Sequence, residues 1–204
     1  MSGTNRKILL AVFLLGLLPA SALAQKPRLE TAVFAGGCFW GVEAVFEHLK
    51  GVTDAVSGYA GGTVANPGYE AVSSGETGHA ESVRVTFDPA RITYEKLLEV
   101  FFTVAHDPTE LNRQGPDVGP QYRSAIFYST EQQARMARAY IARLQQAKVY
   151  KHIVTQVAPL KGFFAAEDYH QDYMKHHPNQ PYIVYNDRPK VEHLKKKFAA
   201  LYKE

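Results

Sequence analysis

The chain has 204 residues, of which 23 are Lys or Arg and 20 are Asp or Glu, so its formal net charge at pH 7 is +3. Such a nearly neutral chain lacks the concentrated positive charge of nucleic-acid-binding proteins, and that class of function is excluded. The length suffices for one domain with a substantial core. Only one cysteine is present, so no disulfide can form within the chain.

The first 24 residues have the pattern of a secretory signal peptide. Arg6-Lys7 precedes an apolar run, and Ala22-Leu23-Ala24 provides the small residues of a cleavage site. The run is short for a membrane span, although a retained N-terminal anchor is the alternative. We expect residues 1–24 to be removed on export, into the periplasm if the source is a bacterium with two membranes. Removal takes away two positive charges and no negative ones, which lowers the net charge from +3 to +1.

The first half of the mature chain alternates between strand and helix patterns. The apolar segment 31–35 predicts a buried strand. Apolar residues then recur at helical spacing, so a helix is expected to begin near Cys38 and to end before Gly51. Strands are predicted over 52–59 and, from the alternation of valines and a phenylalanine, over 82–88. A glycine-rich loop separates these two strands.

The second half begins with a helix from an N-cap at Thr93 to about residue 105. A long irregular loop follows over 106–121, a length that is often functional. The remaining predicted elements are a strand at 122–128, a helix from the Thr130–Gln133 capping box to about 147, a strand at 153–158 and a final helix from about 191. This mixture predicts a single compact α+β domain, with a mixed central sheet of ferredoxin-like core flanked by helices.

Cys38 is placed at the start of the first predicted helix, after Gly36 and Gly37. The free N–H groups and the positive dipole end of a helix N-terminus favour a thiolate, and can lower a cysteine pKa from about 8.5 to roughly 3.5–7.5. The glycines allow a tight turn and leave room near the sulfur. The position therefore predicts a reactive thiol, with a buried, inert cysteine as the alternative.

The segment Gly37-Cys38-Phe39-Trp40-Gly41 resembles the signature of the A-type peptide methionine sulfoxide reductases. Other segments resemble motifs of that family in the same order: GYAGG (58–62), GHAESV (78–83), HDPT (106–109), GPQYRSAIFY (119–128) and AEDYHQDYM (166–174). The resemblance implies that residues 25–204 form a catalytic domain. It also implies the activity, which is thiol-dependent reduction of methionine S-sulfoxide, free or in proteins, and hence repair of oxidised proteins.

The resemblance also implies the roles of individual residues. Cys38 attacks the sulfoxide sulfur and becomes a sulfenic acid, while Glu81 protonates the oxygen. Glu81 shares strand parity with an apolar face, so burial is expected to raise its pKa, as a general acid requires. The other implied site residues are Tyr69 and Tyr122 as donors to the oxygen, Asp117 in the same network, and Phe39 and Trp40 as the apolar wall for the methyl group.

The chain departs from many members of that family because it has no second cysteine to resolve the oxidised enzyme. We therefore expect a one-cysteine form that depends on an external reductant, either thioredoxin-like or glutathione/glutaredoxin-like. The resemblance implies no metal and no organic cofactor, and we expect a monomer. Pro120 stands where the family motif commonly has threonine, and this can shift the loop that carries Asp117.

Four alternatives have different signatures. A cysteine hydrolase would need His79, His106 or His170 within reach of Cys38. A metal site could use His170 with His176 and His177, whereas a zinc deaminase would need two further cysteines. A peptide-binding module without turnover would keep its binding after Cys38→Ser, a change that abolishes reduction.

Overall fold

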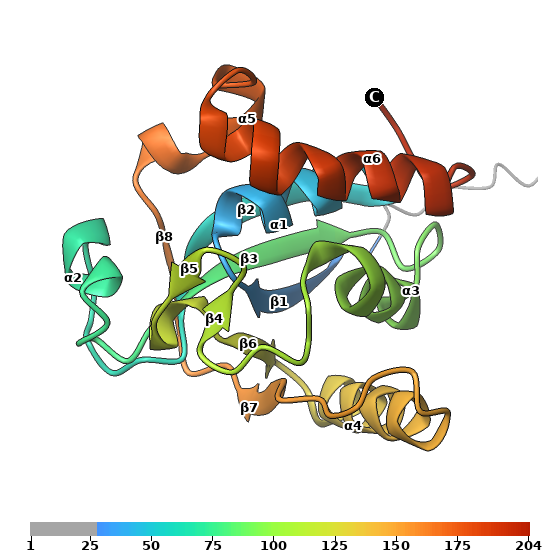
Figure 1. The fold of residues 1–204 in the computed structure, drawn as a ribbon. Helices are drawn as coiled ribbons and strands as arrows, with labels where there is room; N and C mark the ends of the chain where they lie inside the picture. Colours follow the sequence, from blue (N-terminus) through green and yellow to red (C-terminus); the bar gives the residue numbers. More distant parts are fainter. Residues whose placement is uncertain (1–27) are drawn as a thin grey trace, which may run out of the picture.

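The computed structural model describes residues 28–204, so the predicted signal peptide lies outside the described residues. A six-stranded sheet has the order β7-β6-β1-β3-β2-β8 (Figure 1). Its strands are β1 (Glu30–Gly36), β2 (Val52–Ala60), β3 (Ala80–Phe87), β6 (Ser124–Tyr128), β7 (Gln156–Pro159) and β8 (Phe163–Ala165), and a separate hairpin pairs β4 (Arg113–Gln114) with β5 (Asp117–Val118). β6 and β7 are parallel, whereas the other neighbours in the large sheet are antiparallel.

The helices complete a ferredoxin-like core. They are α1 (Phe39–Glu47), α2 (Tyr69–Ser73), α3 (Tyr94–Val100), α4 (Glu131–Gln146), α5 (Tyr173–His176) and α6 (Arg188–Lys197). In chain order, β1, α1, β2, β3, α3 and β6 form a βαββαβ unit, and its strands lie in the antiparallel order β6-β1-β3-β2. The predicted α+β domain with a mixed sheet is therefore confirmed. Among the described helices, none is long and apolar enough to cross a membrane.

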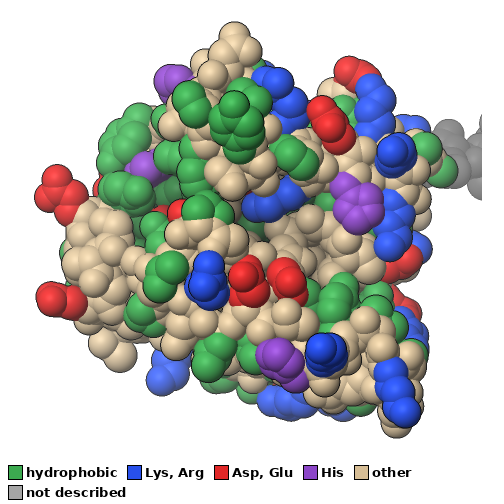
Figure 2. Space-filling view, viewed as in Figure 1, with side chains coloured by type: hydrophobic (Ala, Val, Ile, Leu, Met, Phe, Trp, Pro, Cys, Tyr) green, Lys and Arg blue, Asp and Glu red, His purple; other side chains and the backbone are tan. Residues whose placement is uncertain are grey.

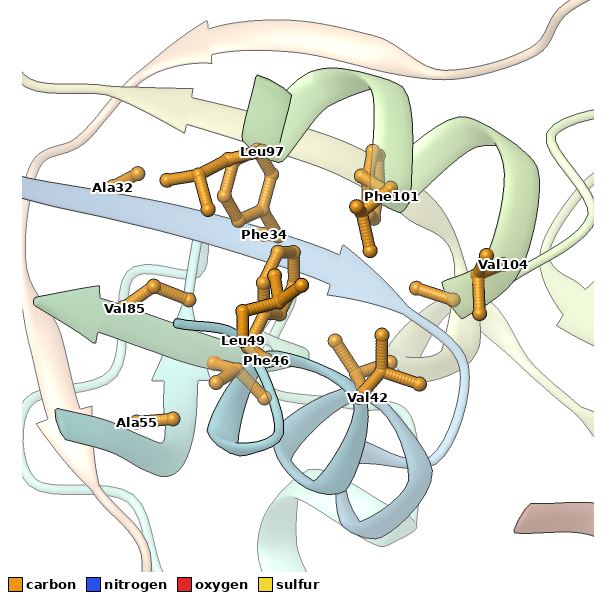
Figure 3. Close-up of a cluster of buried hydrophobic side chains, with 14 of the residues drawn as sticks. Ala32, Phe34, Val42, Phe46, Leu49, Ala55, Val85, Leu97, Phe101 and Val104 are labelled. Carbon is orange, nitrogen blue, oxygen red and sulfur yellow. The ribbon is translucent and has the colours of Figure 1, made fainter. Parts of the chain in front are cut away.

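The apolar core lies between the sheet and the helices α1 and α3. Phe34 of β1 stacks on Phe46 of α1 and packs against Phe101, which follows α3, with ring centroids 5.0 Å apart in both pairs. Figure 3 shows these side chains together with Val42 of α1 and Val85 of β3. Each of the three rings is fully buried, and burial of a phenylalanine contributes about 1.5–3 kcal/mol. This packing fixes α1, and with it Cys38, against the end of β1.

The predicted helix starts are confirmed by their capping bonds. The Thr93 hydroxyl accepts the N–H of Lys96, and the Thr130 hydroxyl accepts the N–H of Gln133, both at 3.2 Å. The first of these helices continues beyond α3 as a π-helical turn, Phe101–Ala105, and so ends where the pattern predicts.

Several boundaries differ from the prediction, and the β4–β5 hairpin lies in the segment 106–121, for which an irregular loop is predicted. Tyr122 belongs to a 3₁₀ turn, Pro120–Tyr122, and not to the strand, which begins at Ser124. Proline suits the first position of such a turn because its φ is restricted and its missing N–H is not needed there. β7 begins at Gln156, three residues later than predicted, and α6 begins at Arg188, with Pro189 in its first turn.

The surface carries mixed charge. On the face in Figure 2, Lys and Arg side chains are interspersed with Asp and Glu side chains. The one basic run of the sequence, 195–197, lies exposed on α6.

Glu43 is a buried carboxyl group of α1, with 1% of its surface exposed, and its Oε1 accepts the Ser57 N–H at 3.2 Å. Burial, followed by repulsion from Glu47, raises its pKa to about 8. The charged form of Glu43 is therefore disfavoured in the folded state. Glu43 has a pKa of about 4.5 in the unfolded chain and about 8 in the folded protein, so the free energy of unfolding decreases as the pH rises between these two values.

We expect the wild-type protein to lose roughly 2–4 kcal/mol of unfolding free energy at this site between pH 5 and pH 8, whereas Glu43→Gln should lose none of it. Denaturant unfolding at both pH values measures the difference, with Glu192→Gln on the exposed face of α6 as the control. Parallel pH profiles for the wild type and Glu43→Gln would contradict the prediction.

Candidate active site

A cavity of about 280 Å³ lies at the amino end of α1. Its lining consists of Cys38, Phe39, Trp40, Tyr69, Glu81, Asp117, Tyr122, Gln180 and Tyr182. All seven residues predicted for the site are in this set. They come from α1, α2, β3, β5 and the turn before β6, so the fold brings together parts of the chain up to 84 positions apart, from Cys38 to Tyr122. Gln180 and Tyr182 were missed, because no local pattern marks them.

The turn between β1 and α1 places the thiol. Gly37 has φ of 90°, a left-handed conformation that favours glycine. A Cβ atom at this position would also lie 2.5 Å from the side chain of Gln114, so no larger residue fits. Cys38 follows as the N-cap residue of α1. The two structural demands explain why glycine precedes the cysteine.

Glu81 lies opposite this helix start, on β3. Its side chain is 2% exposed, and its Oε2 accepts the Phe39 N–H at 3.0 Å. That N–H belongs to the first turn of α1, where backbone donors have no partner within the helix. Burial raises the pKa of Glu81 to about 8, although the Phe39 hydrogen bond opposes the change. At neutral pH the group is therefore mostly a neutral acid, in the direction that the strand pattern predicts.

The expected low pKa of Cys38 is not what the assembled site produces. The side chain is 8% exposed, and burial, followed by the charges of Glu81 and Asp187, raises its pKa well above the usual value. The Trp40 N–H and the charge of Lys190 act in the opposite direction but are outweighed. The helix N-terminus thus favours the thiolate as predicted, but the neighbouring acids and the lack of solvent make the thiol the resting form.

Two tyrosines present neutral phenols to the cavity. Tyr69 begins α2, and its N–H donates to Glu167 Oε1 at 2.9 Å. Burial raises the pKa of Tyr69 to about 12, and it raises the pKa of Tyr122 as well, so both hydroxyls can donate hydrogen bonds at neutral pH. Asp117 accepts a hydrogen bond from the hydroxyl of Tyr182. Proline at position 120 has therefore not displaced Asp117 from the cavity.

The aromatic wall is held by the segment 166–174. Trp40 Nε1 donates to His170 Nδ1 at 3.2 Å, and Tyr173 stacks on the indole with ring centroids 3.7 Å apart. Gln171 forms hydrogen bonds with both the N–H and the C=O of Ser57, at 2.9 and 3.0 Å, and so ties the segment to β2. The segment therefore holds the Trp40 indole in place through His170 and Tyr173. Phe39 is fully buried beside Trp40.

The histidines required by a cysteine hydrolase have other partners. His79 accepts the Gly62 N–H and donates to the Val64 carbonyl, at 3.2 and 2.8 Å. The ring nitrogens of His106 bond to the Phe101 carbonyl and the Ser124 hydroxyl, and burial lowers its pKa to about 4. Neither histidine lines the cavity. Within residues 28–204 there is also no group of three or more His, Cys, Asp or Glu side chains that could hold a metal ion.

Comparisons with known proteins agree on one family. The family model described as peptide methionine sulfoxide reductase matches residues 30–202. A peptide methionine sulfoxide reductase MsrA 2 from Mesorhizobium japonicum is 56% identical over 179 residues, which cover 87% of this chain and 92% of the relative.

Two solved structures have a similar fold. One is the methionine sulfoxide reductase A of Corynebacterium diphtheriae, with a TM-score of 0.68, 36% identity, and coverage of 77% of this chain and 78% of that one. The other is Mxr1 from Saccharomyces cerevisiae in reduced form, with a TM-score of 0.69, 32% identity, and coverage of 76% and 90%.

Proposed function

The chain belongs to the peptide methionine sulfoxide reductase family, and from that premise we propose how the cavity at the start of α1 reduces methionine S-sulfoxide to methionine. The observation that carries the proposal is the composition of this one cavity. It holds a buried thiol, a carboxyl group whose pKa is raised to about 8, and two neutral phenols. Reduction of a sulfoxide needs these parts: a nucleophile for sulfur, a proton for the oxygen, and donors that hold the oxygen.

In the proposed reaction, Cys38 Sγ forms a bond to the sulfoxide sulfur while Glu81 donates its proton to the sulfoxide oxygen. The protonated oxygen then leaves the methionine sulfur and bonds to Cys38 Sγ as the Sγ–sulfur bond breaks, so a thiol and a sulfoxide become a sulfenic acid and a thioether. The cysteine sulfur is oxidised by two electrons and the methionine sulfur is reduced by two. The proton that leaves the thiol returns Glu81 to its acid form, so the step consumes no outside proton.

The substrate is held by its methyl group and its oxygen. Phe39 and Trp40 form the apolar wall for the methyl group, while Tyr69 and Tyr122 donate hydrogen bonds to the oxygen. Asp117 supports the polar side through Tyr182. With two of the three substituents of a pyramidal sulfur held in fixed places, only one configuration presents its sulfur to Cys38.

The remaining parts of the proposal concern partners and location. Because Cys38 is the only cysteine, the sulfenic acid must be reduced by an external thiol, of the thioredoxin-like or glutathione/glutaredoxin-like class. We propose that the protein acts as a monomer. The leader pattern in residues 1–24 supports export, with oxidised proteins of that compartment as substrates.

Turnover of the separate S and R epimers of a methionine sulfoxide peptide tests the assignment, with dithiothreitol, thioredoxin or glutathione as the reductant. We expect the S epimer to be reduced about 10–200-fold faster than the R epimer, because one misplaced group in a fitted pocket lowers transition-state binding by about 1–3 kcal/mol. Equal rates on the two epimers would overturn the assignment. The comparison of reductants identifies the class of external thiol.

A further inference from the structure

Asp187 and Lys190 form an ion pair behind the active-site cavity. Asp187 ends the π-helical turn Ile183–Asp187 and is 0% exposed, and Lys190 lies in the first turn of α6. The Lys190 Nζ is 3.2 Å from Asp187 Oδ1. Neither residue lines the cavity. The carboxylate is fully buried, whereas the Lys190 side chain is 19% exposed, and burying a charged carboxylate is costly even when it is paired.

The pair lies directly against the first turn of α1. A Cβ atom on Gly41 would overlap Asp187 Oδ1 and would lie 2.8 Å from Lys190 Nζ, closer than Cβ atoms approach other atoms. Gly41 follows Cys38 by three positions, a spacing that puts the two residues on the same side of a helix. Figure 1 shows α6 lying across α1. The second glycine of the GCFWG segment therefore makes room for the ion pair one turn from the thiol.

Only one of the two carboxylate oxygens of Asp187 has a hydrogen-bond partner in the described part of the chain. Its Oδ2 is buried and has no hydrogen-bond partner within the described part of the chain. Lys190 thus remains the charged partner of a carboxylate that could accept several further bonds.

The other titratable groups around the thiol are acidic or phenolic. They belong to Glu81 on β3, Asp117 on β5, Asp187 before α6, and the tyrosines Tyr69, Tyr122 and Tyr182. The charge of Lys190 favours the anionic form of Cys38, of Asp117 and of Asp187. Of the influences on the Cys38 pKa, that of Lys190 is smaller than those of Glu81 and Asp187, but Lys190 supplies the positive side-chain charge among them.

We propose that Lys190 is a positioning residue for the reductase reaction: Asp187 holds its ammonium group against the first turn of α1, where it stabilises Cys38 as the thiolate that attacks the sulfoxide. The inference rests on the proposed function of Cys38. Asp187 has two effects, since it places the ammonium group and also opposes its field at the sulfur, where the effect of the carboxylate is the larger of the two.

Three variants and one control separate this role from a merely structural one. Lys190→Met removes the charge and keeps an unbranched stem, Lys190→Arg keeps the charge, and Asp187→Asn removes the negative charge but keeps the shape. Lys197→Met makes the same change as the first variant at an exposed position of α6. The readouts are the pH dependence of Cys38 alkylation by iodoacetamide in the unreacted protein and the rate of a single turnover with methionine S-sulfoxide.

We expect Lys190→Met to raise the apparent pKa of the thiol by about one pH unit, which corresponds to about tenfold less thiolate and a similarly slower single turnover. Asp187→Asn should lower that pKa, while Lys190→Arg and Lys197→Met should leave it near the wild-type value. Opposite shifts for the two single charge removals are the signature of the proposed role. Shifts in the same direction, or none in either variant, would overturn it.

If Lys190→Met does not fold, the proposal can still be tested with a second variant. The double variant Lys190→Met/Asp187→Asn leaves no unpaired buried charge. The difference in Cys38 pKa between this double variant and Asp187→Asn isolates the effect of Lys190. A difference of zero overturns the proposal. Alkylation needs no sulfoxide, so its outcome is independent of turnover. Protein that shows the expected thiol shifts but reduces no sulfoxide would refute the proposed function and not the charge effect.

Discussion

Cys38→Ser should abolish sulfoxide reduction and leave the fold unchanged. Serine has nearly the same shape, but its hydroxyl is a far weaker nucleophile and cannot carry oxygen as a sulfenic acid does. We expect turnover to fall by about 10⁴-fold or more, to background. Thermal unfolding and binding of a methionine sulfoxide peptide should stay close to wild type, because the aromatic wall and both tyrosines are untouched. Retained turnover would place the nucleophile elsewhere.

The wild-type protein provides the complementary measurement. Mixed with excess methionine S-sulfoxide and no reductant, it should release about one methionine per active site and then stop, because no second cysteine can form a disulfide with the sulfenic acid. Dimedone should then label Cys38, and an added dithiol should restart turnover. A release of one methionine with Cys38 still a free thiol would rule out the proposed intermediate.

Glu81→Gln should lower the rate of sulfoxide reduction by about 10²–10⁴-fold, the usual contribution of a general acid. Glutamine keeps the shape and can still accept the Phe39 N–H, but it has no proton to transfer. The pKa of Glu81 is raised from 4.5 to about 8, so its acid form is present below that value and lost as the pH rises through it. Because the Cys38 thiolate still increases with pH in this range, the wild-type single-turnover rate should stop rising above pH ~8, whereas the rate of the variant should continue to rise.

Glu43→Gln is the matched control for this variant. Glu43 is also buried and its pKa is also raised to about 8, but it does not line the cavity. Its substitution should leave the rate within about threefold of wild type. If Glu81→Gln behaves like this control, Glu81 is not the general acid.

Several features of this protein follow from the sequence alone because they depend on neighbours in the chain. The caps at Thr93 and Thr130 are local hydrogen bonds, and the buried strand β3 follows from the alternation over residues 82–88. The start of α1 at Cys38 follows from helical spacing. The family was evident from ordered motifs, and the seven site residues named by that resemblance line one cavity. Their individual roles stay predictions that the variants above test.

Other features required the tertiary structure because they depend on groups that are distant in the chain. The helix start alone predicts a low pKa for Cys38, but Glu81 and Asp187, which lie 43 and 149 positions further along the chain, combine with burial to raise it. Tyr182, Asp187 and Lys190 lie in a segment with no distinctive local pattern, and only the packing of α6 across α1 brings their charges and hydroxyl to the thiol. Local sequence patterns indicate hydrogen bonds between near neighbours and periodic burial. The pKa of a side chain depends on all charged groups that surround it in space, wherever they lie in the chain. The sequence by itself therefore determined the main strands and helices of the βαββαβ unit and the family to which the chain belongs, and the tertiary structure decided the electrostatic state of its cysteine.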